Sequence, residues 1–381
     1  MKKAKGRCAG IVVFCCLLCT YGLLAVCPYA CLPTGRRGGN EPSQKSKIEN
    51  RKSKIDSLVP EAVQIIETAL ADTDPSIKDN AIEVVATTRQ IGLMPKVGRL
   101  LNDEFVSVRF TAALAVGDTQ YRFVRESVGQ LLKDRDENVR IAAAYAMYRL
   151  GYPDNFRLRG ATVASAEALG LIRKAIVSKD QDIRANAALI LGKFNSSLGP
   201  RDPSLERRTT SDERRATILK LLDWALSDKD SGDKVRFQVA EAMAMLGDER
   251  VYPKLWTMLI SAYADDRVIG IRAMGALGTQ QAKNALITML GDKVLEVRLA
   301  AAEQLGCLGS TQGEPEVLDV FRKEFTAGMD AEGIERVHTF AALAIGQIRT
   351  AAVTEFLPKL LKNQSKRVRI AAAKAVLQCA K

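Results

Sequence analysis

Histidine is almost missing from this chain of 381 residues, which contains only His338. Imidazole is the commonest general base near neutral pH and the commonest metal ligand. A Ser-His-Asp triad would have to use this one residue, and no Gly-rich phosphate loop of the Walker type occurs. The scarcity argues against the familiar hydrolase and metal-centre chemistries. We therefore predict no catalytic residue, no metal ion and no cofactor.

Aromatic residues are also scarce, at 6%, although hydrophobic residues make up 47% of the chain. A core with few large rings must be built from small aliphatic side chains, which favours closely packed helices over a β-sandwich. The two tryptophans, Trp224 and Trp256, lie beside leucines in apolar runs. We expect both of them in the core.

Cysteine is concentrated at one end of the chain, where six of the eight fall within the first 31 residues. Only Cys307 and Cys379 lie beyond, which excludes a disulfide framework. Cys16-x-x-Cys19 has the spacing of half a zinc site, but it lies in an apolar run without a second pair. We interpret this run as a membrane segment in which cysteine acts as a small hydrophobic residue.

Charged residues are absent from Cys8 to Gly35, directly after the four cations of MKKAKGR. The run from Ala9 to Cys27 is long enough for one helix across an apolar membrane core of about 30 Å. We therefore predict a signal peptide or membrane anchor over residues 1–33. An uncleaved anchor and a lipoprotein with a lipidated Cys27 both fit the residues around the two cysteines near its end.

Residues 34–56 are rich in Arg, Lys, Ser, Gly and Asn and are expected to form a basic flexible linker. Residues 1–56 carry 11 basic and 3 acidic residues, and the rest of the chain carries 45 and 41. A nucleic-acid partner would need a basic stripe on the folded part, so nucleic-acid binding is disfavoured. Export signals leave their N-terminal cations in the cytoplasm. We therefore place the protein on the extracytoplasmic side of a bacterial envelope, anchored to the membrane.

The remaining chain, residues 57–381, repeats one short pattern, as in DENVRIAAAYAMYRLG. A Val or Ile precedes a basic residue, and small residues follow four and five places after the aliphatic one. Seven clear copies have the basic residues Lys78, Arg109, Arg140, Arg184, Arg236, Arg298 and Arg369. Two weaker copies lie at Ile269-Gly270 and Val337-His338. The commonest spacing, 31 residues, holds two helices and two turns.

Each copy has the features of an amphipathic helix, in which alanines let a neighbouring helix approach and larger aliphatic residues fill the seam. Asp74, Asp136 and Asp180 stand three residues before the aliphatic position, where Asp can cap a helix N-terminus. We expect helices to end near four glycines, Gly117, Gly151, Gly192 and Gly306. A second amphipathic run, such as KVGRLL, precedes most copies.

These helix pairs resemble HEAT repeats, and more narrowly the short HEAT-like repeats first named from phycobilisome lyases. The pattern Asp-x-x-Val-Arg-x-x-Ala-Ala-x-Ala-Leu-Gly is best kept by Asp136 to Leu150 and Asp180 to Gly192. The resemblance implies an all-α, right-handed α-solenoid (superhelix) of about nine two-helix repeats, each packed on its neighbours. It also implies that the basic residue pairs with an acid of its own or the adjacent repeat in a structural ladder. Anion binding is the alternative role.

The resemblance says less about function, because one fold hosts many activities. We predict a non-catalytic scaffold that binds a protein partner while tethered to a membrane. The alternatives are a lyase-like or chromophore-assembly factor and a nucleic-acid-binding protein. The iron site of the related deoxyhypusine hydroxylases uses paired His-Glu motifs, which a chain whose single histidine is followed by Thr339 cannot build.

Surface positions of the second helices are candidate partner contacts, namely Glu83, Tyr145, Glu241, Glu303 and Lys374. Two insertions, Pro153 to Ala164 and Asn195 to Asp212, are expected as loops at one rim. The last copy, Arg369 to Lys381, looks like an internal repeat and not like a polar cap. We therefore expect an exposed apolar end, through which the chain self-associates or stacks on another protein.

Overall fold

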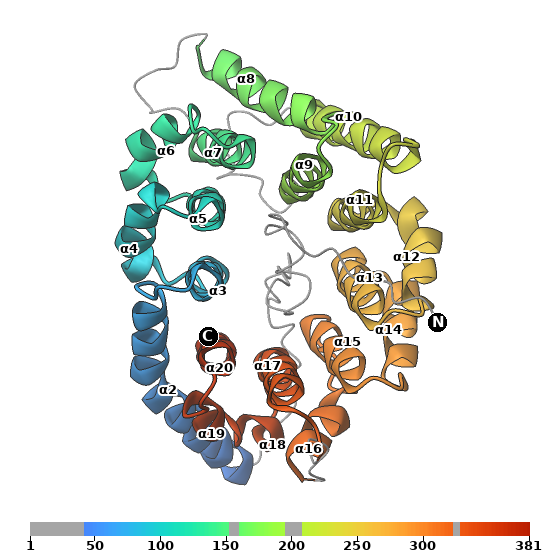
Figure 1. Ribbon diagram of the computed structural model, residues 1–381. Coiled ribbons are helices and arrows are strands. Elements are labelled where there is room, and N and C mark those ends of the chain that lie inside the picture. Colours follow the sequence, from blue (N-terminus) through green and yellow to red (C-terminus); the bar gives the residue numbers. More distant parts are fainter. Residues whose placement is uncertain (1–41, 152–159, 195–207, 323–327) are drawn as a thin grey trace, which may run out of the picture.

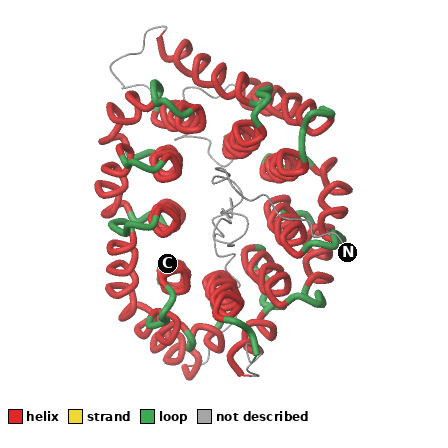
Figure 2. The backbone as a smooth tube through the Cα atoms, in the orientation of Figure 1, coloured by secondary structure: helices red, strands yellow, loops and turns green. Residues whose placement is uncertain are grey.

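The computed structural model describes residues 42–151, 160–194, 208–322 and 328–381. Within these ranges every element is a helix, which confirms the predicted all-α class. The helices alternate between an inner and an outer layer, and short turns join the two layers (Figures 1 and 2). The signal or anchor predicted over residues 1–33, with Cys27, lies outside the described residues.

The inner layer contains the second helix of each repeat. In the described ranges there are nine such helices, as the pattern predicts. They are α3 (Pro75–Thr87), α5 (Val106–Thr119), α7 (Glu137–Leu150), α9 (Gln181–Lys193), α11 (Asp233–Met245), α13 (Ala264–Leu277), α15 (Leu295–Cys307), α17 (Ala331–Ile348) and α20 (Lys366–Cys379). Consecutive members pack side by side, and their alanines are buried at the contacts.

The outer layer contains the first helix of each repeat, several of them flanked by short 3-10 turns. The α-helices are α2 (Pro42–Ala69), α4 (Met94–Arg99), α6 (Arg125–Leu131), α8 (Gly160–Ala175), α10 (Arg208–Ser227), α12 (Tyr252–Leu259), α14 (Gln280–Met289), α16 (Glu314–Arg322), α18 (Ala351–Thr354) and α19 (Leu357–Leu361). The 3-10 turns are η1 (Ile91–Leu93), η2 (Leu100–Asn102), η3 (Arg122–Val124) and η5 (Glu249–Val251).

The array closes into a ring, because the C-terminal helix α20 packs against α2 and α3 at the other end of the array (Figure 1). The Lys366 ammonium lies 2.6 Å from the Asp72 carboxylate, and the Lys374 ammonium lies 3.0 Å from that of Glu83. The prediction of an exposed apolar C-terminal end is therefore wrong. The apolar face of the last repeat is covered by α2 and α3, the first repeat of the same chain.

The predicted N-caps are confirmed at three helices. The carboxylate of Asp74 accepts a hydrogen bond from the backbone N–H of Ser76, and Asp136 and Asp180 cap α7 and α9 in the same way. Satisfying these otherwise unpaired donors explains why an acid precedes the Val-Arg motif.

The glycines near the ends of the inner helices serve packing more than termination. Gly151 does end α7, with φ at 63°. Gly117, Gly192 and Gly306 instead lie inside the last turns of α5, α9 and α15. A Cβ on Gly192 would lie 2.8 Å from Cα of Ala242 in the next inner helix. The absence of a side chain is what allows this close approach.

Three segments predicted to be irregular are helical where the structure describes them. The linker expected over residues 34–56 is helical from Pro42 onward as the start of α2, and Ile55 is buried. Lys, Glu and Gln are good helix formers. A segment of low hydrophobicity that is rich in them can therefore form a helix instead of a flexible linker. The two expected insertion loops end in helix as well, since α8 begins at Gly160 and α10 at Arg208. Their remaining residues, 153–159 and 195–207, lie outside the described ranges.

Candidate partner-binding surfaces

The basic residues of the repeat motif lie at the turns between repeats. Nε and Nη2 of Arg109 donate to the Asp134 carboxylate at 2.8 and 3.0 Å, and Nη1 donates to the backbone carbonyls of Asp103 and Glu104. Burial raises the pKa of Asp134, but the hydrogen bonds from Arg109 and the backbone outweigh it and hold the pKa below its usual range. The guanidinium therefore links its own turn to the next repeat.

Three other predicted ladder residues pair with an acid of the following repeat. Lys78 lies 2.7 Å from Asp103 and Arg298 lies 2.7 Å from Glu316. Arg184 pairs with Asp228 and lowers the pKa of that carboxyl. These cations and the acids they contact are mostly withdrawn from solvent, which leaves little of their charge for another ligand.

Among the described residues, the remaining ladder positions form no ion pair with the following repeat. Arg140 and Arg236 lie 3.7 and 3.8 Å from acids in their own helices, Glu137 and Asp233. Arg369 donates from Nη1 to two backbone carbonyls, those of Asn363 and Gln364.

The sixth repeat contains a ladder residue that the sequence pattern missed. Arg267 Nη2 donates to Asp292 Oδ1 at 3.0 Å, and Nη1 donates to the carbonyls of Ser261 and Ala262, as Arg109 does in its repeat. The alignment on Ile269-Gly270 is therefore wrong by three residues. Arg267 lies 31 residues after Arg236 and 31 before Arg298, so the regular spacing was the signal that could have found it.

The five candidate contact residues all lie on inner helices, but four of them are buried. Glu83 and Lys374 pair with each other across the ring closure. The hydroxyl of Tyr145 donates to Asp118 at 2.6 Å, and Lys193 donates to the other oxygen of that carboxylate at 2.8 Å. Their expected exposure is wrong, because the closure and the packing of successive inner helices were not visible in the sequence.

The other two candidates differ in their surroundings. Glu241 is half-buried and accepts a hydrogen bond from Gln238. Glu303 is buried, and burial raises the pKa of its carboxyl to about 7, although the positive charges of Lys374 and Arg272 act in the opposite direction. Arg272 of α13, Glu303 of α15 and Lys374 of α20 thus interact electrostatically between the inner helices.

His338 occupies the ladder position of the eighth repeat, and no acid among the described residues pairs with it. Its ring stacks on Phe321 with the centroids 5.8 Å apart, and burial lowers its pKa. In the described part of the chain its Nδ1 atom has no hydrogen-bond partner. No three His, Cys, Asp or Glu side chains are grouped to hold a metal ion in those same ranges. None of the described helices is long and apolar enough to cross a membrane.

Helix α12 is apolar on two adjacent faces. Leu255, Met258 and Leu259 are buried on the inward side. Tyr252, Trp256 and Ile260, four residues apart, form a stripe that continues to Tyr263 in the following turn. We call these four side chains the α12 aromatic surface.

Most of this surface faces solvent. Tyr263 is 74% exposed and Ile260 is 68% exposed, and Tyr252 stacks on Trp256. Trp224 on α10 is also exposed, with the Arg184 guanidinium 5.2 Å from its ring centroid. The prediction that both tryptophans belong to the core is wrong, because these outer helices leave both side chains on an exposed side.

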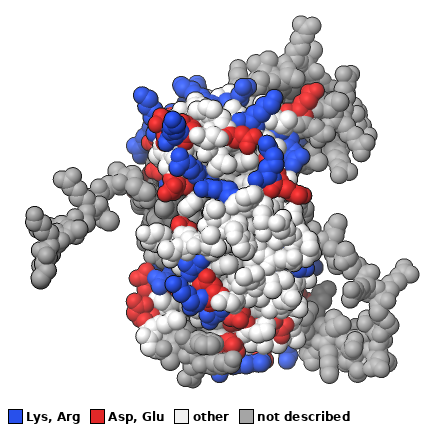
Figure 3. Space-filling model, turned by 90° about the vertical axis from the view of Figure 1, so that its right-hand side faces the viewer, with Lys and Arg blue, Asp and Glu red and all other residues white. Residues whose placement is uncertain are grey.

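Charged side chains are sparse in the middle of this side of the ring. Figure 3 views the side on which α12 and α14 lie, and Lys, Arg, Asp and Glu gather toward its two ends with a broad uncharged area between them. Exposed apolar patches on an otherwise well-packed protein are typical of binding surfaces.

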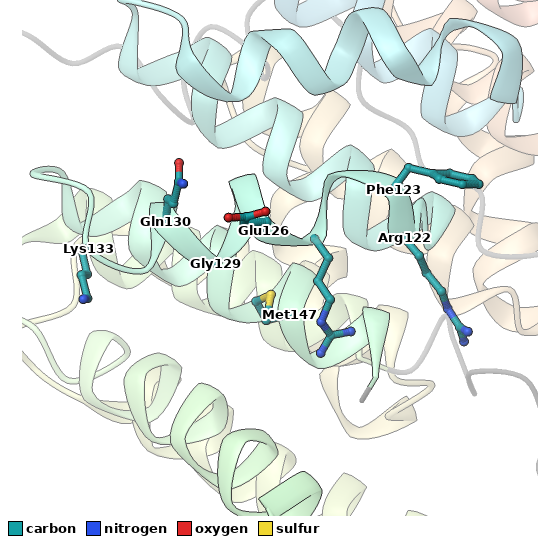
Figure 4. Close-up of a pocket in the computed structure, with 8 residues that line it drawn as sticks. Arg122, Phe123, Glu126, Gly129, Gln130, Lys133 and Met147 are labelled. Carbon is teal, nitrogen blue, oxygen red and sulfur yellow. The ribbon is translucent and has the colours of Figure 1, made fainter. Parts of the chain in front are cut away.

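A basic groove lies beside α6, on the outside of the third repeat (Figure 4). Its volume is about 730 Å³. The lining residues are Arg122, Phe123, Arg125, Glu126, Gly129, Gln130, Lys133 and Met147. Three cations and one acid give it an excess of positive charge. The sequence pattern did not indicate this groove, because its charged residues lie in η3, in α6 and in the turn after α6, outside the Val-Arg motif.

A family model for HEAT repeats matches residues 94–158, which contain the second repeat and the helices of the third. This part of the chain therefore carries HEAT repeats, as its Val-Arg-x-x-Ala-Ala pattern indicated. No curated protein matches its sequence.

Several solved structures are similar to the chain. Human deoxyhypusine hydroxylase in complex with glycerol is 15% identical, with 88% of this chain and 99% of that chain covered and a TM-score of 0.35. The complex of CpcE and CpcF of phycocyanin lyase from a Nostoc species is 17% identical, with coverage of 74% and 94% and a TM-score of 0.37. An importin beta is 15% identical, with coverage of 84% and 46% and a TM-score of 0.36. Similarity at this level says nothing of activity or partners.

Proposed function

We propose that this chain is a non-catalytic HEAT-repeat scaffold that binds a protein partner through the α12 aromatic surface. The observation that carries the proposal is the second apolar face of α12, on which Trp256 and Ile260 are exposed to solvent together with Tyr263. Trp and Tyr are enriched among the residues that dominate binding energy at protein interfaces. Exposing them costs a protein free energy that a bound partner recovers.

A photoreactive amino acid at Tyr263 tests the proposal in the cells that make the protein. We expect one partner to crosslink there, and to be lost when Trp256→Ser and Ile260→Ser are combined. The matched control combines Ile91→Ser and Val177→Ser, which remove exposed aliphatic side chains elsewhere on the ring. A crosslink that survives the α12 variant, or one that both variants abolish, contradicts the proposal.

We further propose that residues 1–33 tether the ring to a membrane, on the extracytoplasmic side of a bacterial envelope. The support is the uncharged run from Cys8 to Gly35 behind four cations. Cell fractionation with protease shaving tests both parts together. Recovery of the full chain in the membrane fraction, with the ring digested from outside, is expected. A chain that stays with the cytosolic fraction contradicts the tether.

The non-catalytic part of the proposal has its own test against the lyase-like alternative. The purified protein is expected to stay colourless, with an unchanged absorption spectrum after bilin is added. Stable uptake of bilin would instead support chromophore assembly.

A further inference from the structure

We propose that the groove beside α6 binds an acidic, extended segment of a protein partner. This inference rests on the proposed scaffold function and adds to it the chemical class of a bound segment and a second surface. The groove lies on the third repeat, whereas the α12 aromatic surface belongs to the sixth.

The charge of the groove is the first argument. Arg122 and Lys133 are exposed, and within the described ranges neither side chain forms an ion pair or a hydrogen bond. The ladder cation Arg109 is by contrast held by Asp134. Exposed cations that are not paired with an acid attract and orient an acidic partner.

The distribution of the lining residues favours a peptide over a polyphosphate or a nucleic acid. Lys133 lies at one end, while Arg122 and Phe123 lie at the other, and Glu126 and Gly129 lie between them (Figure 4). The central acid would repel a continuous line of phosphates. Carboxylates spaced along an extended chain can reach the two ends and avoid it.

An apolar contact accompanies the cations. Phe123 is 89% exposed, with its ring 5.2 Å from that of Tyr121, and Met147 lies in the groove between the two ends. An exposed aromatic ring beside separated cations suits a segment in which acidic residues flank an apolar one.

The first experiment measures binding of a fluorescent peptide, in which aspartates flank a Leu-Trp core, to the full chain. We expect Arg122→Glu combined with Lys133→Glu to weaken the affinity by at least about tenfold. The control combines Lys220→Glu with Lys229→Glu, which changes the net charge equally at exposed positions elsewhere. An equal loss in both variants would show general charge attraction and overturn the proposal.

A second variant blocks the groove without changing any charge. A Cβ on Gly129 would meet no atom within 4 Å, so Gly129→Phe places its ring in open space. We expect it to weaken peptide binding, while Gly170→Phe on α8, where a Cβ also meets nothing, leaves binding unchanged. Unaltered affinity in the Gly129 variant would place the peptide elsewhere.

Two further probes separate the alternatives. The same peptide with asparagine in place of aspartate is expected to bind much more weakly. A single-stranded DNA that binds as tightly as the acidic peptide and competes with it would overturn the peptide assignment. If the unmodified chain binds the peptide but gives no partner crosslink at Tyr263, the α12 surface alone is contradicted. If it gives the crosslink but does not bind the peptide, the groove alone is contradicted.

Discussion

At the scale of single residues, the ladder cations differ in how much free energy they contribute. Arg267 holds Asp292 with two guanidinium nitrogens at 2.8 and 3.0 Å, and both side chains are nearly fully buried. Arg236 lies 3.8 Å from a largely exposed Asp233. Removing one member of a buried pair leaves the other charge uncompensated, whereas an exposed pair is largely screened by water.

We therefore expect Arg267→Ala to lower the free energy of unfolding by about 3 kcal/mol. Arg236→Ala, the matched control, should cost less than about 1 kcal/mol. Urea titration followed by circular dichroism measures both. Equal costs would show that the ladder position, and not burial, sets the contribution.

The buried carboxyl of Glu303 makes stability depend on pH. Its pKa is about 7 in the folded chain, against 4.5 ordinarily, because burial disfavours its charged form. Between these pH values the folded chain keeps a proton that the unfolded chain has released, so the contribution of Glu303 to stability is highest below pH 4.5 and falls toward pH 7. Buried Asp79, whose pKa is also raised to about 7, acts in the same direction.

Replacing the carboxyl by an amide should remove this dependence at one site. We expect Glu303→Gln to raise the free energy of unfolding by about 3 kcal/mol at pH 8 and by much less at pH 5. Thermal or urea unfolding at the two pH values measures the difference. A gain that does not change with pH would contradict the assigned cause.

The sequence predicted these residues unevenly. Most ladder positions could be found because Val-Arg-x-x-Ala-Ala is a local pattern that packing requires in every repeat. Arg267 was missed because Asp266, which accepts a hydrogen bond from Ser261, replaces the aliphatic residue before it. The pairing of Glu83 with Lys374 could not be predicted, since nothing local indicates a contact between residues 291 positions apart.

At the scale of the elements, packing between inner helices depends on glycines in their last turns. At Gly192 a methyl group would press on the backbone of Ala242, and the backbone cannot move aside as a flexible side chain would. At Gly170 on α8 the corresponding space is open. Alanine substitution at Gly192 combines steric crowding with the higher helix propensity of alanine, whereas at Gly170 only the helix propensity acts.

Alanine at these two positions should have opposite effects. We expect Gly192→Ala to destabilise the protein by about 1–3 kcal/mol. Gly170→Ala should stabilise it by up to about 1 kcal/mol, because alanine restricts the unfolded chain. Differential scanning calorimetry of the two variants measures both signs. Stabilisation by both substitutions would mean that α9 and α11 are not in close contact.

The positions of the helices could be predicted from the sequence. Which face of each helix is buried and which is exposed was harder to predict. The amphipathic runs and Asp caps located most pairs. Helix α12 was interpreted from its apolar residues alone, so its outward Trp256 was placed in the core although its side chain is exposed. A helix with two apolar faces gives the same composition whether the second face meets this chain or another molecule.

At the scale of the whole molecule, the ring follows from small rotations that add up over nine repeats. The motif of a single repeat does not encode this sum, which is why the sequence indicated an open superhelix. Closure removes both free ends of the array, and it explains how a chain whose last repeat lacks a polar cap covers its terminal apolar face.

The most direct measurement of the closure is zero-length crosslinking with a carbodiimide, followed by mass spectrometry of the monomer band. An amide bond between Lys366 and Asp72, whose charged groups lie 2.6 Å apart, is expected within one chain. The Lys78–Asp103 pair, at 2.7 Å and within adjacent repeats, is the control that forms in either a ring or an open array. Recovery of both links in the monomer supports the closed ring, whereas recovery of the control with the Lys366–Asp72 link absent, or found only in crosslinked dimers, would contradict it.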